Sequence, residues 1–287
     1  MSRGYITIAQ NSEDIDYLEM SYALALSLKA TQENSNLCVC VDEETKKLIT
    51  DKHKKVFDAI VDIPWNDDAR GDKWKIHNKW KYPHMTPYDE TIILDSDMIF
   101  TESVDYWWGY LAKKDVWCCT NVKTFRNEDV TSDYYRKKFT QLNLPNVYSN
   151  FTYFNKSELT FEFFRMVELI MTHWNVYFDK FLAGVGQNWM SADVAYALAI
   201  QLLDIEAETC DYDIKDVPTF VHMKSMVQNV PVTMIESNWT KSITSELGDD
   251  LQVKIGNFTQ TLPVHYVEKN WMDESKIKQL EFDSYGE

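Results

Sequence analysis

The first hundred residues alternate between apolar runs and mixed segments in a way that predicts strands and helices in turn. Apolar or β-branched runs cover 5–9, 37–41 and 57–63, and each ends in polar or turn-forming residues. Between the first two lies 17–29, where apolar residues recur every three or four positions, and before the third lies the polar segment 43–53, which predicts a helix. This alternation favours an α/β fold with a mostly parallel, Rossmann-like central sheet, flanked by helices and joined by right-handed crossovers.

The stretch 91–100, TIILDSDMIF, begins as another such strand and continues into charged residues. Its uninterrupted apolar start is typical of a central strand buried on both faces, and it leads directly into Asp95 and Asp97. Residues two apart in an extended chain point to the same side, so both carboxylates can reach one divalent ion while Ser96 points away. Open α/β sheets bind ligands at the carboxyl ends of their strands. We predict a metal-diphosphate site here; a solvated turn is the alternative, because Asp and Ser favour turns.

The rest of the chain continues as strands and helices. We expect an aromatic helix around Trp107, Trp108 and Tyr110, a strand at 116–122 and another at 147–154. The polar segment 125–145 shows little apolar periodicity and is interpreted as a mobile or acceptor-facing insertion. A helix starting at Ser157 is predicted to bury one apolar face, formed by Phe161, Phe164, Val167, Met171 and Trp174.

Further on, a short Gly184/Gly186 loop precedes Ser191, which we expect to cap a helix over 194–203. From Asp204 onward the sequence predicts short strands and loops, which contain His222 and His265. We find no internal repeat, low-complexity tract or linker, so a single domain over 1–287 is favoured.

Composition narrows the class of protein. Apolar residues make up 45% of the 287 residues and aromatic residues 14%, enough for a large core. No stretch reaches the roughly 18 apolar residues of a membrane span, and the N-terminus has no signal-like apolar run, so we expect a cytoplasmic protein without membrane contact. The five cysteines are an odd number without C-x-x-C spacing, which favours reduced thiols over disulfides or a zinc site.

The net charge of −16 argues against attraction of the whole surface to nucleic acid or anionic lipid. Basic residues are nevertheless concentrated beside aromatic ones in two places, an arrangement that suits phosphates and stacked bases. The alternative is a solvated face with buried rings. The two clusters are Lys73, Lys75, Lys79 and Lys81 with Trp74 and Trp80, and Arg136, Lys137 and Lys138 with Tyr134 and Tyr135.

Three stretches have the order and spacing of a known family. Ala9-Gln10-Asn11 is followed by Tyr17 and the helical run ALALSLK; Lys79 and Tyr88 precede Asp95 by sixteen and seven residues; and LDSDMIF contains the aspartates. Together they resemble the glycogenin-like retaining glycosyltransferases of family 8, whose nucleotide-diphospho-sugar fold is called GT-A. The resemblance implies a UDP-sugar-dependent enzyme that transfers a hexosyl or pentosyl group, with 1–105 binding the nucleotide-sugar and 106–287 the acceptor. It also implies a divalent ion, Mn²⁺ before Mg²⁺.

The resemblance further implies roles for individual residues in binding the donor. Asp95 would contact ribose and metal, and Asp97 would coordinate the metal. Ser96, between them, is counted with the donor-binding residues. The others are Ala9 and Asn11 in the nucleoside pocket, Tyr17 stacked on uracil, and Lys79 at the nucleotide-sugar.

The C-terminal half follows the family less closely. The stretch at 264–271, with His265 and Lys269, resembles the family's His-aromatic segment, in which the His completes the metal site and the Lys meets the diphosphate. His222 in Val221-His222-Met223-Lys224 is the competing candidate. Asp193 stands where the family has Asp-Gln but is followed by Val194, which leaves retention or inversion open. We expect Asp193 to orient the acceptor hydroxyl or to act as general base, with Lys79 stabilising charge at the diphosphate.

Several functions stay open at this level. A nucleotidyltransferase of the same fold and a non-catalytic protein that binds sugar nucleotides are the alternatives to transfer. A phosphatase of the haloacid dehalogenase type is disfavoured, because its D-x-D usually opens the domain. The acceptor is a hydroxyl group. One hypothesis is the hydroxymethylated bases of bacteriophage DNA, contacted through 136–138; a carbohydrate or small molecule is the alternative, and no obligate protein partner is inferred.

Overall fold

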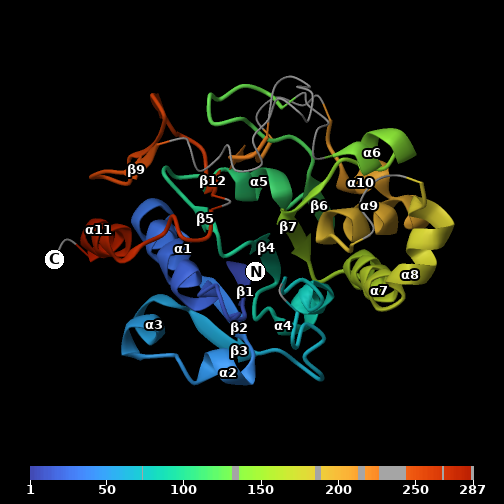
Figure 1. The fold of residues 1–287 in the computed structure, drawn as a ribbon, viewed down its shortest axis with the longest axis horizontal. Helices are drawn as coiled ribbons and strands as arrows, with labels where there is room; N and C mark the ends of the chain where they lie inside the picture. The colour runs from blue at the N-terminus through green and yellow to red at the C-terminus, as the bar shows by residue number, and fades with distance from the viewer. Residues whose placement is uncertain are drawn as a thin grey trace.

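The centre of the fold is a six-stranded sheet within the residues that the computed structural model describes: 1–72, 74–130, 136–184, 189–212, 217–225, 244–266 and 268–285. The strand order is β3-β2-β1-β4-β7-β6, and β7 alone runs against the other five (Figure 1). The predicted α/β fold with a mostly parallel sheet is therefore confirmed. The strands are β1 (Arg3–Ala9), β2 (Leu37–Val41), β3 (Ala59–Asp62), β4 (Glu90–Leu94), β6 (Val116–Cys119) and β7 (Tyr148–Asn155).

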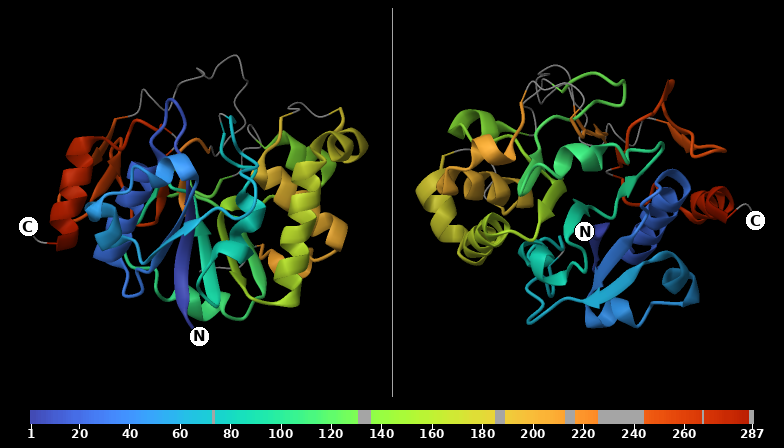
Figure 2. Two further views of the ribbon diagram at one scale, coloured as in Figure 1. Left: turned by 90° about the horizontal axis from the view of Figure 1, so that it is seen from below. Right: turned by 180° about the vertical axis from the view of Figure 1, so that it is seen from behind.

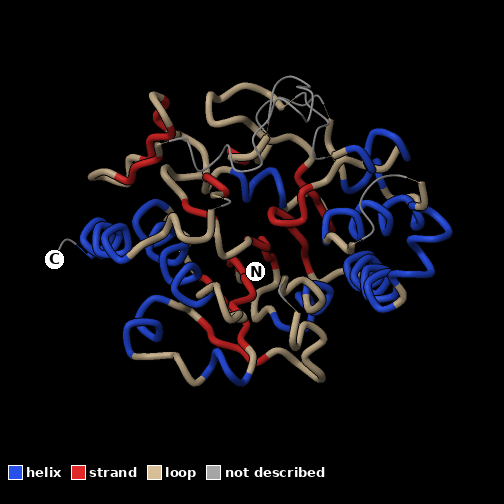
Figure 3. The backbone as a smooth tube through the Cα atoms, in the orientation of Figure 1, coloured by secondary structure: helices blue, strands red, loops and turns tan. Residues whose placement is uncertain are grey.

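Helices cover both faces of this sheet, and strands occupy the middle (Figure 3). Side chains that follow one another along β2 alternate between the two cores: Leu37, Val39 and Val41 face one, and Cys38 and Cys40 the other. The first core is closed by α1, α3, α5 and α11, and the second by α4, α6, α7 and α9. The helices are α1 (Tyr17–Thr31), α2 (Glu43–Lys46), α3 (Asp51–Val56), the 3₁₀-helix η1 (Lys79–Lys81), α4 (Tyr82–Met85), α5 (Trp107–Leu111), α6 (Lys137–Leu142), α7 (Glu158–Thr172), α8 (Trp174–Tyr177), the π-helix η2 (Phe178–Leu182), α9 (Ala192–Leu203), α10 (Glu206–Thr209) and α11 (Glu274–Tyr285).

Two small sheets of three strands lie beside the large one. In the first, β12 pairs with β5 on one side and with β8 on the other. This sheet joins three segments that are far apart in the sequence, and one of them directly follows β4. The strands are β5 (Met98–Ile99), β8 (Val221–His222) and β12 (Val264–His265), with β9 (Ser245–Leu247), β10 (Val253–Ile255) and β11 (Phe258–Thr259) in the second sheet.

The predicted helix over 43–53 is instead two helices, α2 and α3. Asp42 caps α2 by accepting a hydrogen bond from the Thr45 backbone N–H at 2.7 Å. The second helix begins after Thr50, whose backbone N–H donates to Nδ1 of His53 at 3.0 Å in a capping box. The second cap explains the break, because it satisfies backbone groups that a continuous helix would use itself.

The buried face of α7 differs from the predicted one. Ser157 caps the helix as expected, accepting from the Thr160 N–H at 3.2 Å. Phe164, Val167 and Met171 are buried as predicted. Phe161 is 41% exposed, however, whereas Phe163 is fully buried against α9, so the buried face is shifted from the predicted one. Trp174 lies beyond the end of α7, in α8.

Two further predictions hold only in part. Ser191 is the N-cap residue of α9 as expected, but its side chain makes no capping hydrogen bond. The segments 125–145 and 204–287 contain the helices α6, α10 and α11, which were not predicted. Gly186 lies outside the described residues.

Among the described helices, none has the length and apolar character to cross a membrane.

Candidate active site

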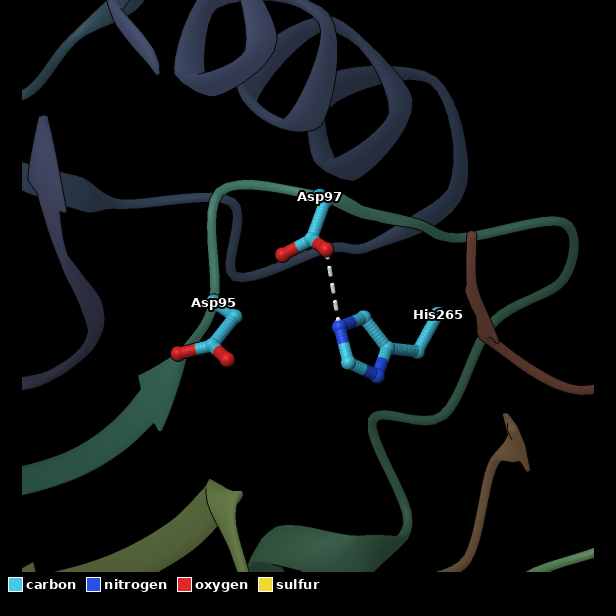
Figure 4. A group of neighbouring side chains, drawn as sticks. All are labelled: Asp95, Asp97 and His265. Carbon is cyan, nitrogen blue, oxygen red and sulfur yellow. Dashed lines mark hydrogen bonds and ion pairs between the residues drawn. The ribbon is translucent and has the colours of Figure 1, made fainter. Parts of the chain in front are cut away.

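Asp95 and Asp97 lie where β4 leaves the sheet and turns toward β5 (Figure 4). The side chain of Asp95 is 25% exposed and that of Asp97 only 4%. Figure 4 shows both carboxylates converging with the ring of His265, which comes from β12. The ligand atoms of the three residues all lie within 4.8 Å of one another.

The pairing of β12 places His265 in this group. Its register sets His265 opposite Met98 on one side and opposite His222 on the other. The Tyr266 N–H then donates to the Asp97 carbonyl at 3.0 Å, and Nε2 of His265 lies 2.9 Å from Oδ2 of Asp97. The ring of His222 is 5.1 Å from that of His265, and its Nδ1 is bonded to Ser225 at 2.8 Å.

Two lysines bring positive charge to the aspartates. Nζ of Lys79 donates to Oδ1 of Asp95 at 2.6 Å, and Nζ of Lys269 donates to Asp97. Burial by itself raises the pKa of Asp97, but His265 and Lys269 outweigh it and hold that pKa well below its usual value. Asp97 is thus a buried carboxylate that keeps its charge.

This donor set fits a hard divalent ion. Two carboxylate oxygens and one imidazole nitrogen suit Mn²⁺ or Mg²⁺ better than a thiolate-binding metal. Nε2 of His265 faces the carboxylates, while its Nδ1 is buried without a hydrogen-bond partner in the described structure. Asp95, Asp97 and His265 are therefore the residues that would hold such an ion.

Tyr17 stands at the first position of α1, beside the same group. The ring centroid lies 5.9 Å from Nζ of Lys269. Lys269 in turn donates to Asp97, so the ring lies beside this group. Burial raises the pKa of the Tyr17 hydroxyl, and the charges of Asp97 and Asp95 raise it further.

The other predicted donor residues of the N-terminal half share this edge of the sheet. Ala9 is the buried last residue of β1, the strand next to β4. Asn11 holds the turn before α1, because its side chain donates to Asp16 and accepts from the Leu18 N–H, both at 2.9 Å. Ser96 is buried, with 4% of its surface exposed.

A buried polar network behind this edge was missed in the sequence. Gln10 donates to Asp67 at 3.0 Å and accepts from Asn78 at 2.8 Å, and Asn78 also donates to Asp67 at 2.7 Å. Burial raises the pKa of Asp67, but Asn78 and Gln10 lower it overall. This network ties the end of β1 to the segment that leads into Lys79. The only sequence signal is that polar residues end a buried strand.

Asp193 lies at the first turn of α9 and is held by an unpredicted partner, Arg136. The Arg136 guanidinium donates to Oδ2 of Asp193 at 2.5 Å, while Ser149 donates to Oδ1 through both its hydroxyl, at 2.6 Å, and its N–H, at 2.9 Å. Arg136 is itself sandwiched by Phe139 and Tyr148, 3.9 and 4.1 Å from their ring centroids. Burial raises the pKa of Asp193, but these partners lower it below its usual value.

The charges of both groups act on Lys224. Burial lowers the pKa of its ammonium group, Asp193 and Asp97 oppose that change, and Lys269 and Arg136 reinforce it. No spacing pattern in the sequence indicated this lysine.

Four described cations of the two predicted basic clusters are turned inward, whereas Lys137 is exposed. Arg136 pairs with Asp193, and Lys138 is 5% exposed, with its Nζ 4.5 Å from the centroid of Phe178. Lys79 and Lys81 are 8% and 1% exposed. These side chains point inward because acids and rings attract them there. Lys73, Tyr134 and Tyr135 lie outside the described residues.

Solved structures resemble the fold of this chain, although no family model and no curated protein matches the sequence. The structure of galactosyltransferase LgtC in complex with donor and acceptor sugar analogues aligns over 98% of this chain and 95% of that chain, with a TM-score of 0.53 and 12% identity. The chain has the GT-A fold. Mouse xyloside xylosyltransferase 1 covers 74% of this chain and 84% of its own, at TM-score 0.46 and 11% identity. The glycosyltransferase GlyE of Streptococcus pneumoniae TIGR4 aligns over 74% of this chain and 46% of that chain, with a TM-score of 0.39 and 13% identity.

In the GT-A fold of this chain, the predicted site residues come together at one edge of the sheet. Asp95, Asp97, His265 and Lys269 form one group, and Lys79 contacts it through Asp95. Asp193, at the first turn of α9, belongs to a separate group with Arg136 and Ser149.

Proposed function

We propose that this protein transfers a sugar from a UDP-sugar to a hydroxyl acceptor, with a divalent ion bound by Asp95, Asp97 and His265. The observation on which the proposal depends is the convergence of these three ligands at the carboxyl end of β4 in a GT-A fold. LgtC, which shares that fold, was solved with donor and acceptor sugar analogues. Mn²⁺ is the ion we expect, and Mg²⁺ the second choice.

Sugar transfer requires that the departing diphosphate be neutralised. The bound ion supplies Lewis-acid stabilisation of that leaving group. Lys79 and Lys269, already beside the two aspartates, add fixed positive charge where negative charge develops. Tyr17 offers a ring for the uracil base near the same carboxylates.

Asp193 is proposed to orient the acceptor hydroxyl. Its carboxylate is held on two sides by Arg136 and Ser149, so its position is fixed before any substrate binds. The lowered pKa keeps it ionised, and therefore able to accept a hydrogen bond from a hydroxyl group.

Among the acceptors considered, a carbohydrate is better supported than hydroxymethylated DNA. Contacts to DNA phosphates require exposed cations. Arg136 and Lys138 of the predicted cluster are turned inward, and the chain carries a net charge of −16. A neutral acceptor avoids this repulsion.

Asp97→Asn tests the proposal. We expect wild-type protein to release UDP from a UDP-sugar in the presence of Mn²⁺, and to stop when a chelator is added. The variant should lose Mn²⁺-dependent UDP binding by at least about 100-fold, because a metal ligand is removed. Asp51→Asn, at a carboxylate that is 92% exposed on α3, is the matched control and should bind UDP normally. If neither the chelator nor Asp97→Asn reduces UDP release, the metal site is excluded.

A further inference from the structure

Four aromatic side chains form a cluster on the flank of α4 and α7, which lie side by side (Figures 1 and 2). The rings of Trp65 and Trp80 are stacked with centroids 5.7 Å apart and an interplanar angle of 8°. His84 meets Trp65 edge-on at 5.0 Å, and Phe161 lies 5.7 Å from His84. We call these four residues the aromatic platform: Trp65, Trp80, His84 and Phe161.

Trp65 is the unusual member of the aromatic platform. It is 67% exposed, so its indole gains little from burial. Its backbone has φ of 59°, in the left-handed region that a bulky residue adopts only at an energetic cost. Strain of this kind is kept where it serves a site. The strained turn presents the exposed side of one indole to solvent while Trp80 supports the other side.

The surroundings of the aromatic platform are acidic. Nε1 of Trp80 donates to Asp68 at 3.2 Å. Burial lowers the pKa of His84, and the charge of a second carboxylate, Glu168, opposes this. Lys81 lies 5.3 Å from the Trp80 centroid, but it is buried and paired with Asp68 at 3.0 Å. The described surface therefore combines aromatic rings with acceptor oxygens, and the cation that contacts Trp80 is already paired with a carboxylate.

These features suit a neutral sugar ring. A pyranose has a flat face of C–H groups, which carry a small positive charge and pack on the negative face of an aromatic ring. Its hydroxyls at the ring edge can donate to carboxylates such as Asp68. Nucleobases also stack on indoles, but their phosphates need nearby cations. A neutral oligosaccharide is thus favoured over a nucleic acid.

The aromatic platform is linked to the candidate active site through η1. Lys79, which contacts Asp95, and Trp80 are consecutive residues of this short helix. Consecutive side chains on a 3₁₀-helix point about 120° apart, since it has about three residues per turn. One rigid element therefore directs Lys79 to the site and Trp80 to the outer flank.

We propose that the aromatic platform binds a neutral oligosaccharide, as a subsite for the distal part of a long carbohydrate acceptor. The inference rests on the proposed sugar transfer for its role, but the binding itself needs neither donor nor metal. A chain held at Trp65 and reaching past η1 would present its end to the site at Asp95.

The test is binding of maltohexaose, cellohexaose and xylohexaose to metal-free protein, by calorimetry and Trp fluorescence. We expect wild-type protein to bind at least one of them. Trp65→Gly should weaken that binding by about tenfold or more, because an aromatic anchor is lost. Glycine adopts a positive φ without strain, so this variant should keep the fold. Trp65→Phe, which keeps a smaller ring, should bind with intermediate affinity.

Tyr106→Ala is the matched control. Tyr106 is 66% exposed and precedes α5, which covers the face of the sheet opposite to α4 and α7. This variant should bind the sugars like wild type. The proposal is overturned if wild type binds none of the three, if Trp65→Gly binds as well as wild type, or if a single-stranded oligonucleotide is the ligand that Trp65→Gly loses. Absence of UDP release by wild type, with sugar binding intact, would refute the proposed transfer and leave the sugar-binding site.

Discussion

At the scale of single residues, the site is governed by carboxylates that stay charged although they are buried. Asp97 is held by His265 and Lys269, and Asp193 by Arg136 and Ser149. In both cases the partners lower a pKa that burial alone would raise. A carboxylate kept ionised in this way can bind a metal ion or a hydroxyl group, which an acid driven neutral by burial could not do.

The Asp193–Arg136 pair predicts how stability depends on pH. Because the pKa of Asp193 is lower in the folded protein than the unfolded value of about 3.9, the ionised pair stabilises the fold above that pH and the contribution is lost as pH falls. Asp193→Asn leaves Arg136 without its anion and should cost about 3 kcal/mol at pH 7. The measurement is Tm from pH 7 down to pH 3 for both proteins.

The gap in Tm between wild type and Asp193→Asn should narrow at the acid end, because below about pH 3.9 the unfolded wild-type chain binds a proton at Asp193 before the folded protein does. A gap that stays constant over this range would show that the charge of Asp193 contributes nothing to stability.

At the scale of secondary-structure elements, the short strand β12 assembles the site. It contributes only two residues, yet its pairing with β5 sets His265 opposite Met98, next to Asp97. The neighbouring strand β8 sets His222 one strand further away. The choice between the two histidines is therefore a matter of strand order within a sheet of three strands.

This strand order predicts the relative effect of removing each histidine. His265→Ala should weaken Mn²⁺ binding by about 100-fold or more, because it removes a ligand. His222→Ala removes only a neighbour of that ligand and should cost about tenfold at most. Free Mn²⁺ can be counted by electron paramagnetic resonance in a titration of each variant. A larger loss in His222→Ala would move the third ligand to His222.

The rotation of α7 can be tested with two phenylalanines two positions apart. Phe163→Ala should lower the free energy of unfolding by about 3–5 kcal/mol, because a fully buried ring is removed from the core. Phe161→Ala should change it by less than about 0.5 kcal/mol, since that ring is 41% exposed. Urea denaturation measures both. A larger loss in Phe161→Ala than in Phe163→Ala would support the face predicted from the sequence.

At the scale of the whole molecule, positive charge is directed toward the candidate site although the protein as a whole is acidic. The chain is strongly acidic overall, and cations such as Lys79, Lys269 and Arg136 are turned toward the candidate site. Positive charge is thus placed where a diphosphate would bind, while the outer surface repels polyanions.

This distribution predicts that duplex DNA with hydroxymethylated bases does not bind, even at about 20 mM salt, where charges are weakly screened. Lys137, the exposed residue of the cluster at 136–138, should be replaceable by Glu without effect on a mobility-shift assay. Binding that weakens steeply as salt rises, and that Lys137→Glu abolishes, would instead restore DNA as the acceptor.

The sequence by itself determined the parts of the fold in which neighbours along the chain decide the outcome. A run such as Leu37–Val41, apolar on both sides of an extended chain, can be satisfied only between two helical layers, and it forms β2 as predicted. The spacing of Asp95 and Asp97 likewise follows from local geometry.

Tertiary structure decided what depends on partners far away in the chain. Val221-His222 and Val264-His265 are the same dipeptide, and only strand pairing puts the second beside Asp97. The charge of Arg136 is visible in the sequence, but its direction is set by Asp193, 57 residues later. A sequence shows the sign of a charge and the period of an apolar pattern. Which distant group pairs with that charge or covers that apolar face depends on packing, because a buried polar side chain is stable only beside a compensating partner.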